Sequence, residues 1–187
     1  MQPDPGRWMR DAAKIVPLVY VLAVLQVAVA PMFSPYPGTP DLLLVVVVAL
    51  ALWRGMETAA VAGFFAGLLL DAVTYAPLGL TSLLYVAAAV AVSRRVEPDP
   101  DLVVVGGARR RPGRLVVWSV IAATGVQFGE VVLHLLLGTQ IDLGYLWWSQ
   151  ILPTVIQTGL AALILSPLLR RLFARDMPSD AARIATA

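Results

Sequence analysis

The feature that most constrains this chain is a series of long apolar stretches separated by short polar segments. The stretches are residues 15–33, 42–53, 58–76, 80–92, 115–137 and 145–169. A helix of about 20 apolar residues spans the ~30 Å hydrocarbon core of a bilayer. Hydrophobic side chains make up 59% of the chain and charged ones only 14%. We therefore predict an all-α integral membrane protein with six transmembrane helices.

Basic residues are confined to alternate polar segments: before the first stretch, between the second and third, between the fourth and fifth, and after the sixth. Lys and Arg concentrate in cytoplasmic segments. Six crossings with both termini in the cytoplasm therefore place all 14 basic residues on the inner side. The predicted parts are a cytoplasmic segment (1–14), a membrane domain (15–169) with a cytoplasmic loop (93–114), and a cytoplasmic tail (170–187).

The arginines at 94–95 and 109–114 have two interpretations. They are topology determinants, or they also hold anionic lipid headgroups, which attract basic residues near the membrane surface. Since the basic residues flank apolar stretches and do not form one polar face, we expect no nucleic-acid binding.

The second apolar stretch is unusually short. Thr39 is predicted as the N-cap of its helix and Pro40 as the first helical residue, with Asp41 near the positive end of the helix dipole. The apolar part Leu42–Trp53 spans only about 18 Å at 1.5 Å per residue. We expect the helix to continue through residues 54–57 and to cross the membrane. The alternative is a re-entrant hairpin formed by residues 40–76.

The third stretch carries small residues at every fourth position. Ala59, Gly63 and Gly67 lead to Asp71, so all four lie on nearly the same face of a helix. Small residues let helix backbones approach closely in a membrane. We therefore expect this helix at the centre of the protein, with the stripe packing against another helix of the chain or against a partner. Further small residues extend such packing on the third and fourth stretches: Ala62, Ala66, Ala87, Ala88 and Ala91.

Asp71 precedes a turn that contains Pro77 and Gly79. A carboxyl group inside a membrane is costly unless it meets protein groups. The structural interpretation is that Asp71 satisfies a helix end or an exposed N–H of this turn. The functional interpretation is that it fixes the geometry of a partner contact, and the turn residues belong to the same candidate interface.

Three polar residues share one face of the fifth stretch: Gln127, Glu130 and His134, at positions i, i+3 and i+7. With the predicted topology they lie in the same leaflet as Asp71. A joint polar cluster of Asp71, Glu130 and His134 is one hypothesis, and a purely structural network is the other. We expect no metal site, because a metal needs more close ligands than these residues offer.

The sequence argues against an enzyme and against a bound cofactor. It contains no cysteine and only one histidine. The H-E-x-x-H motif of metalloproteases is absent, and no G-x-S-x-G nucleophile accompanies the histidine. The acids Glu97, Asp99 and Asp101 lie in a segment broken by prolines, which does not suit phosphotransfer.

Four segments occur in an order and spacing that resemble a known family. They are PDLLLVVVVALALWRG (40–55), AGFFAGLLLDAVTYAPLGLTSLLY (62–85), LPTVIQT (152–158) and SPLLRRL (166–172). Together they resemble the rod shape-determining protein MreD family over about two thirds of the chain. The Gly-rich helix with its Asp and the following Pro-x-Gly is the most specific part.

The resemblance implies a non-catalytic scaffold in the inner membrane of a rod-shaped bacterium. Members bind MreC, and through it connect to the MreB filament and to RodA with its partner transpeptidase, which maintains cell shape and lateral peptidoglycan synthesis. The family is also similar in fold to the substrate-binding subunits of energy-coupling-factor transporters. The alternative function is therefore binding of a vitamin or another small molecule for transport. The A-x-x-x-A pattern of those subunits is absent from the first stretch.

Overall fold

The computed structural model describes residues 5–29, 32, 38–95, 112–136, 138, 144 and 147–173. The described residues form helices and no strand, which confirms the all-α prediction for this part of the chain. The elements are α1 (Pro5–Val24), η1 (Leu25–Val29, π-helical), α3 (Leu42–Trp53), α4 (Met56–Thr74), α5 (Leu80–Arg95), α7 (Pro112–Leu136), η2 (Trp147–Ile151, π-helical) and α9 (Leu152–Phe173). Most of the predicted cytoplasmic loop and tail lies outside the described residues.

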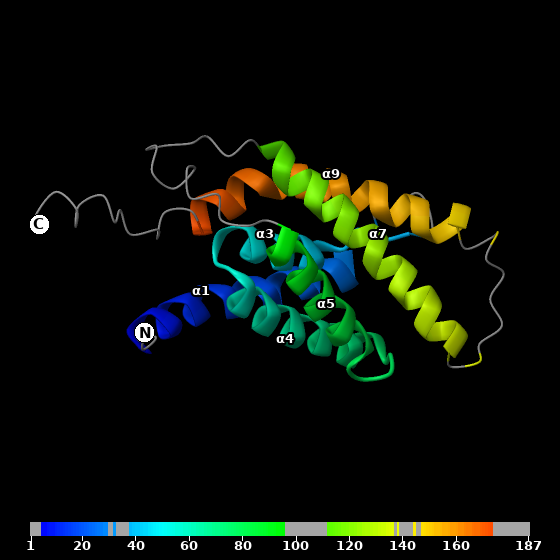
Figure 1. Cartoon of the computed structure of the whole chain (residues 1–187), viewed down its shortest axis with the longest axis horizontal. Coiled ribbons are helices and arrows are strands. Elements are labelled where there is room, and N and C mark those ends of the chain that lie inside the picture. The colour runs from blue at the N-terminus through cyan, green and yellow to red at the C-terminus, as the bar shows by residue number, and fades with distance from the viewer. Residues whose placement is uncertain are drawn as a thin grey trace, which may run out of the picture.

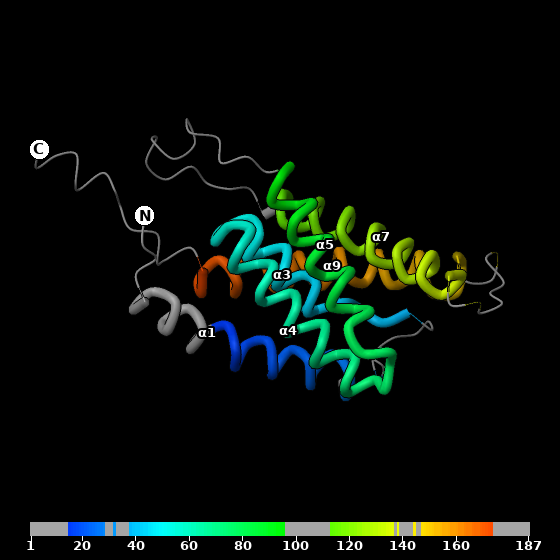
Figure 2. Tube along the Cα trace, turned by 60° about the horizontal axis from the view of Figure 1, so that its bottom comes forward, coloured from blue at the N-terminus to red at the C-terminus, as the bar shows by residue number. Residues whose placement is uncertain are grey.

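Helix α3 is the centre of the structure. It packs against α1, α4, α5, α7 and α9, which surround it (Figures 1 and 2). No residue from Leu42 to Leu52 is more than 7% exposed. The expectation that the third apolar stretch forms the centre is therefore wrong. Helix α4 lies in the surrounding layer, because it buries only the face that carries its small residues and exposes large apolar side chains such as Phe65 on the other.

Both ends of α3 differ from the sequence-based prediction. The N-cap is Asp41 and not Thr39, since the Asp41 side chain accepts a hydrogen bond from the backbone N–H of Leu44. At the other end the helix stops at Trp53, and the chain turns through Gly55, whose φ is +96°. A continuous helix through residues 54–57 is therefore wrong. Glycine adopts such a positive φ without the steric cost of a Cβ.

The helices alternate in direction along the bundle (Figures 1 and 2). Helices α1, α4 and α7 begin at the end of the bundle where α3, α5 and α9 finish. This end carries Arg54, Arg94, Arg95, Arg114 and Arg170, and we call it the basic end. The other end, where α3 and α5 begin, we call the opposite end. The α4–α5 turn lies there.

Three helical segments are long and apolar enough to cross a membrane: Met56–Thr74, Gly113–Leu136 and Trp147–Phe173. Two shorter apolar segments accompany them, Ile15–Ala28 and Leu42–Trp53. Helix α5 has 16 residues, which corresponds to about 24 Å. Six crossings therefore stay a prediction, while the membrane character of the chain is clear.

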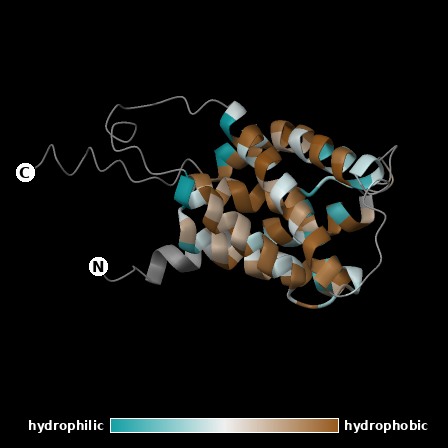
Figure 3. Cartoon of the chain, turned by 45° about the vertical axis from the view of Figure 1, so that its right-hand side comes forward, coloured by the Kyte–Doolittle hydropathy of each residue, from teal (hydrophilic) through white to brown (hydrophobic). Residues whose placement is uncertain are grey.

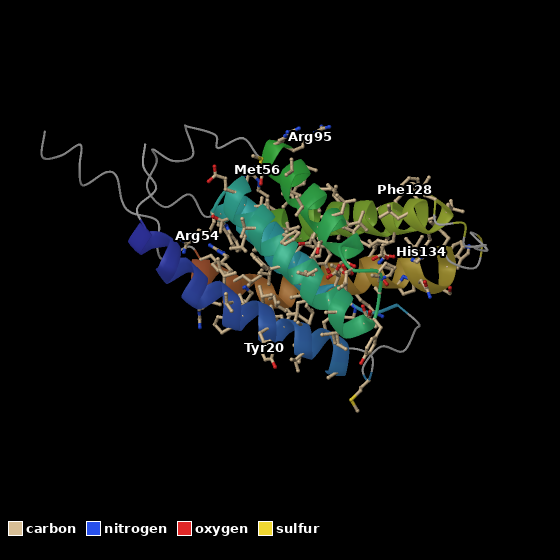
Figure 4. The ribbon with its side chains drawn as sticks, turned by 90° about the horizontal axis from the view of Figure 1, so that it is seen from below. Tyr20, Arg54, Met56, Arg95, Phe128 and His134 are labelled. Atoms are coloured by element: carbon tan, nitrogen blue, oxygen red, sulfur yellow. The ribbon has the colours of Figure 1, made fainter. Side chains whose placement is uncertain are left out.

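The outer surface of the surrounding helices is strongly apolar, and hydrophobic residues predominate along the helices visible in Figure 3. Many large side chains on it are 40% exposed or more, including Tyr20, Phe65, Phe128 and Ile164. Tyr20 points away from the other helices in Figure 4. Such a surface is unfavourable in water, and it suits contact with lipid or with other membrane helices.

Candidate functional site: buried polar contacts and close helix packing

The small-residue stripe of α4 packs inside the protein, against α5. A Cβ atom built on Gly67 would lie 2.4 Å from the backbone N of Ser82 and 2.5 Å from its Cα. At Gly63 the nearest atoms are the backbone C and O of Tyr85, both at 3.3 Å. Ala59 is completely buried. The two helices therefore approach most closely at Gly67, where only glycine fits.

Asp71 lies at the end of this stripe and holds the start of α5. Its side chain is 0% exposed, and its two carboxylate oxygens accept hydrogen bonds from the backbone N–H of Gly79 (2.8 Å) and of Thr81 (3.3 Å). These are N–H groups that a helix cannot satisfy within itself. The acid therefore meets donors of its own chain, as the structural interpretation expects.

The α4–α5 turn has an unusual backbone. Tyr75 adopts a left-handed conformation (φ +56°), and Gly79 has φ +94°. The carbonyl of Pro77 accepts a hydrogen bond from Leu80 N–H (3.3 Å). Tyr75 itself is 96% exposed. The turn is thus fixed by backbone contacts and by Asp71, while its aromatic ring lies outside the packed structure.

A second polar network surrounds the start of the central helix. The Oδ1 atom of Asp41 accepts hydrogen bonds from the Tyr85 hydroxyl (2.5 Å), from Leu44 N–H (3.0 Å) and from Gln26 Nε2 (3.4 Å). The backbone N–H of Asp41 donates to Thr158 Oγ1 (2.9 Å). One residue therefore joins α3 to η1, α5 and α9.

Gln26 completes this network from the π-helical segment η1. Its Oε1 atom accepts a hydrogen bond from the backbone N–H of Leu43 at 3.0 Å. Gln26 and Asp41 together satisfy two of the free N–H groups at the start of α3. Three residues of this network were not predicted from the sequence: Gln26, Tyr85 and Thr158. The available signal was that each is an isolated polar side chain in an apolar stretch, which by itself marks an interior position.

The three polar residues of α7 differ in how deeply they are buried. Gln127 and Glu130 are half-buried on α7. His134 is exposed near the end of α7 (Figure 4). A joint cluster with Asp71 and His134 stays a prediction. In the part of the chain that the structure describes, no group of three or more His, Cys, Asp or Glu side chains could hold a metal ion.

The arrangement is that of a packed helical protein whose buried polar groups hold helices in register. The family model for the rod shape-determining protein MreD matches residues 12–175. The chain belongs to the MreD family. No match was found among curated proteins or among solved structures. The MreD family is a family of structural membrane proteins with a role in determining rod shape, and it is not a known enzyme family.

Proposed function

We propose that this protein is a non-catalytic scaffold of the bacterial rod complex. In this role it binds MreC in the cytoplasmic membrane and connects through MreC to MreB, RodA and the partner transpeptidase. It thereby helps to maintain cell shape and lateral peptidoglycan synthesis. The proposal rests on membership of the MreD family together with a closed helical interior and an apolar outer surface.

One observation carries this proposal: the small residues and the buried acid of α4 contact other parts of the same chain. The backbone of α5 lies directly against Gly67, so no side chain from a partner can enter there. Asp71 accepts hydrogen bonds from two backbone N–H groups at the start of α5. These positions support packing within the protein. The surfaces left for a transmembrane helix of MreC are the exposed apolar faces of α1, α4, α7 and α9.

We also propose six crossings with both termini in the cytoplasm. The alternating directions of the helices and the collection of arginines at the basic end support this topology. The short helix α3 is enclosed by five others, so its length need not match the hydrocarbon thickness. The basic end would then face the cytoplasm.

Site-specific crosslinking tests the MreC contact, and it benefits from a chain without cysteine. Single cysteines at one exposed position on each of α1, α4, α7 and α9 would carry a photoreactive label in native membranes: Val21, Phe65, Ile121 and Ile164. We expect crosslinks to MreC from one helix or from two neighbouring helices. A cysteine at the fully buried Ala162 is the matched control and should give none. Failure of MreC to copurify with the wild-type protein would contradict the proposal.

The competing role is substrate binding for a small-molecule transporter. What favours it is the collection of polar side chains at the opposite end of the bundle, including Asp41, Asp71 and Glu130. Against it, Asp41 and Asp71 are already engaged by donors of the protein. A vitamin that binds only the native state must raise its stability. A thermal-shift screen with purified protein therefore distinguishes the two roles.

A further inference from the structure

Two arginine-bearing helix ends that are distant in sequence lie together at the basic end. Helix α5 finishes with Arg94 and Arg95, and α7 carries Arg114 in its first turn. The two helices contact each other, and their ends lie near each other in Figures 1 and 2. Figure 4 shows Arg95 pointing away from the bundle. Positive charge from both helices therefore gathers at one place.

The contact between Gly129 and Leu84 fixes which side of α7 faces α5. A Cβ built on Gly129 would lie 2.4 Å from Leu84 Cδ2. Gly125, Trp118 and Arg114 precede Gly129 by about one, three and four helical turns, so they follow the same side of α7 toward the basic end. Arg114 thus lies on the edge of α7 that is next to α5.

The same edge of α5 carries small, exposed side chains. Ala87 and Ala91 follow Leu84 at i+3 and i+7, and both are exposed. On α7, Gly125 is also exposed, and a Cβ built there would meet nothing within 4 Å. Below the three arginines, these small residues therefore form an apolar strip along the helix pair, while larger side chains such as Leu83 and Phe128 are exposed beside it.

We propose that this surface, the α5–α7 face, binds one anionic phospholipid. Its members are Ala87, Ala91, Arg94, Arg95, Arg114, Trp118 and Gly125. Arginine forms strong, often bidentate hydrogen bonds with phosphate oxygens, and basic sites between membrane helices on the cytoplasmic side suit acidic headgroups. The small residues let acyl chains lie close to the backbone. Trp118 follows Arg114 by about one helical turn, and its side chain is half-buried against the core.

Charge complementarity selects a lipid over a protein helix as the occupant. Within the described part of the chain, no carboxylate forms an ion pair with Arg94, Arg95 or Arg114. Three cations directly above an apolar strip match a molecule with an anionic head and apolar tails. This inference needs no partner protein and is therefore independent of the proposed MreC contact.

The test measures lipid binding to the purified, delipidated full-length protein by native mass spectrometry. The probes are dioleoylphosphatidylglycerol and the neutral dioleoylphosphatidylcholine. We expect the wild type to retain one phosphatidylglycerol in preference to phosphatidylcholine. The double variant Arg95→Gln, Arg114→Gln should bind phosphatidylglycerol roughly thirtyfold more weakly, from about fivefold for each arginine near the surface.

A matched control removes the same charge elsewhere at the basic end. The double variant Arg170→Gln, Arg171→Gln on α9 should keep the wild-type affinity and preference. Gly125→Leu changes no charge and should still weaken phosphatidylglycerol binding several-fold by filling the acyl position. Equal weakening by both arginine pairs, or no effect of Gly125→Leu, would show general surface attraction and overturn the proposal. Wild-type affinities that are equal for the two lipids would overturn it as well.

Discussion

Helices α3 and α4 are joined by a tight turn, yet they are buried in different ways. Helix α3 has large apolar side chains in every direction and is enclosed on all sides. Helix α4 buries a stripe of small residues against α5, and its other side exposes Phe64 and Phe65, whose rings pack edge to face at 5.5 Å. The two helices thus represent two means of packing in a membrane protein.

The sequence patterns of the two helices indicate different surroundings. A stripe of small residues on one face indicates close approach to a single neighbour. A short helix that is apolar all round, with branched side chains everywhere, indicates enclosure by several neighbours. Only the second pattern marks the centre of this protein. The following substitutions test the contrast between one-sided and all-round packing.

Gly67→Leu should have the largest effect. Its side chain would enter the backbone of Ser82 and force α4 and α5 apart, so the free energy of unfolding should fall by more than about 3 kcal/mol, beyond ordinary overpacking. The measurement is the amount of folded protein recovered from membranes and its thermal stability in detergent. Gly125→Leu is the control, because its added side chain has open space. Normal stability of Gly67→Leu would mean that the two helices are not in close contact.

Leu44→Ala tests the enclosure of α3. Leu44 is 0% exposed, and its truncation would leave a cavity that costs about 2 kcal/mol or more. Leu163→Ala on α9 is the matched control, since Leu163 is 52% exposed and its loss leaves no cavity. Reversible unfolding in mixed micelles would compare the two. Similar destabilisation by both variants would be inconsistent with a central α3.

The hydrogen bond between Tyr85 and Asp41 should contribute a moderate coupling. A double-mutant cycle with Tyr85→Phe and Asp41→Ala isolates it, because each change removes one partner of the bond, and we expect a coupling free energy of about 1 kcal/mol, as for other polar contacts between membrane helices. A cycle with Thr74→Val in place of Tyr85→Phe is the control, because the Thr74 hydroxyl bonds only locally to Leu70 O. Additive effects of the first pair would exclude a direct contribution.

Tyr75→Gly should have the smallest effect and the opposite sign. The left-handed backbone at Tyr75 is unfavourable for a residue with a Cβ, and its exposed side chain makes little packing contact. We expect the variant to be as stable as the wild type or more stable by up to about 1 kcal/mol. Thermal unfolding of Tyr75→Gly and Tyr75→Ala side by side would check this, with alanine expected to give no gain. A clear loss of stability in Tyr75→Gly would show that the ring is packed.

Much of the fold could be predicted from the sequence because it follows from hydrophobic length and charge. The apolar stretches predicted the helices. Pro77 and Gly79 predicted the turn between α4 and α5, and α5 begins at the expected Leu80. The identity of the central helix could not be predicted from α4 alone. Enclosure of α3 depends on five neighbours, and contacts between distant segments leave no local pattern.

The buried polar contacts also differ in how far they could be predicted, because some join residues close in sequence and others join distant ones. Asp71 bonds to residues eight and ten positions away, so a nearby turn with free N–H groups was a sufficient clue. Asp41 bonds to Gln26, Tyr85 and Thr158, which are 15 to 117 positions away in sequence. When each apolar stretch carries an isolated polar residue, the sequence does not indicate which of these residues bond to one another. Only the assembled bundle identifies these groups as one network.

The enclosure of α3 has a consequence for how the protein is made. Membrane segments enter the bilayer in the order of their synthesis, so α3 arrives before four of the five helices that surround it. Thr158 lies on α9, the last of these five neighbours to be synthesised, and bonds to the start of α3. The core therefore stays open to lipid until α9 has been synthesised. Truncated chains that lack α9 should consequently be recognised and degraded as unfinished.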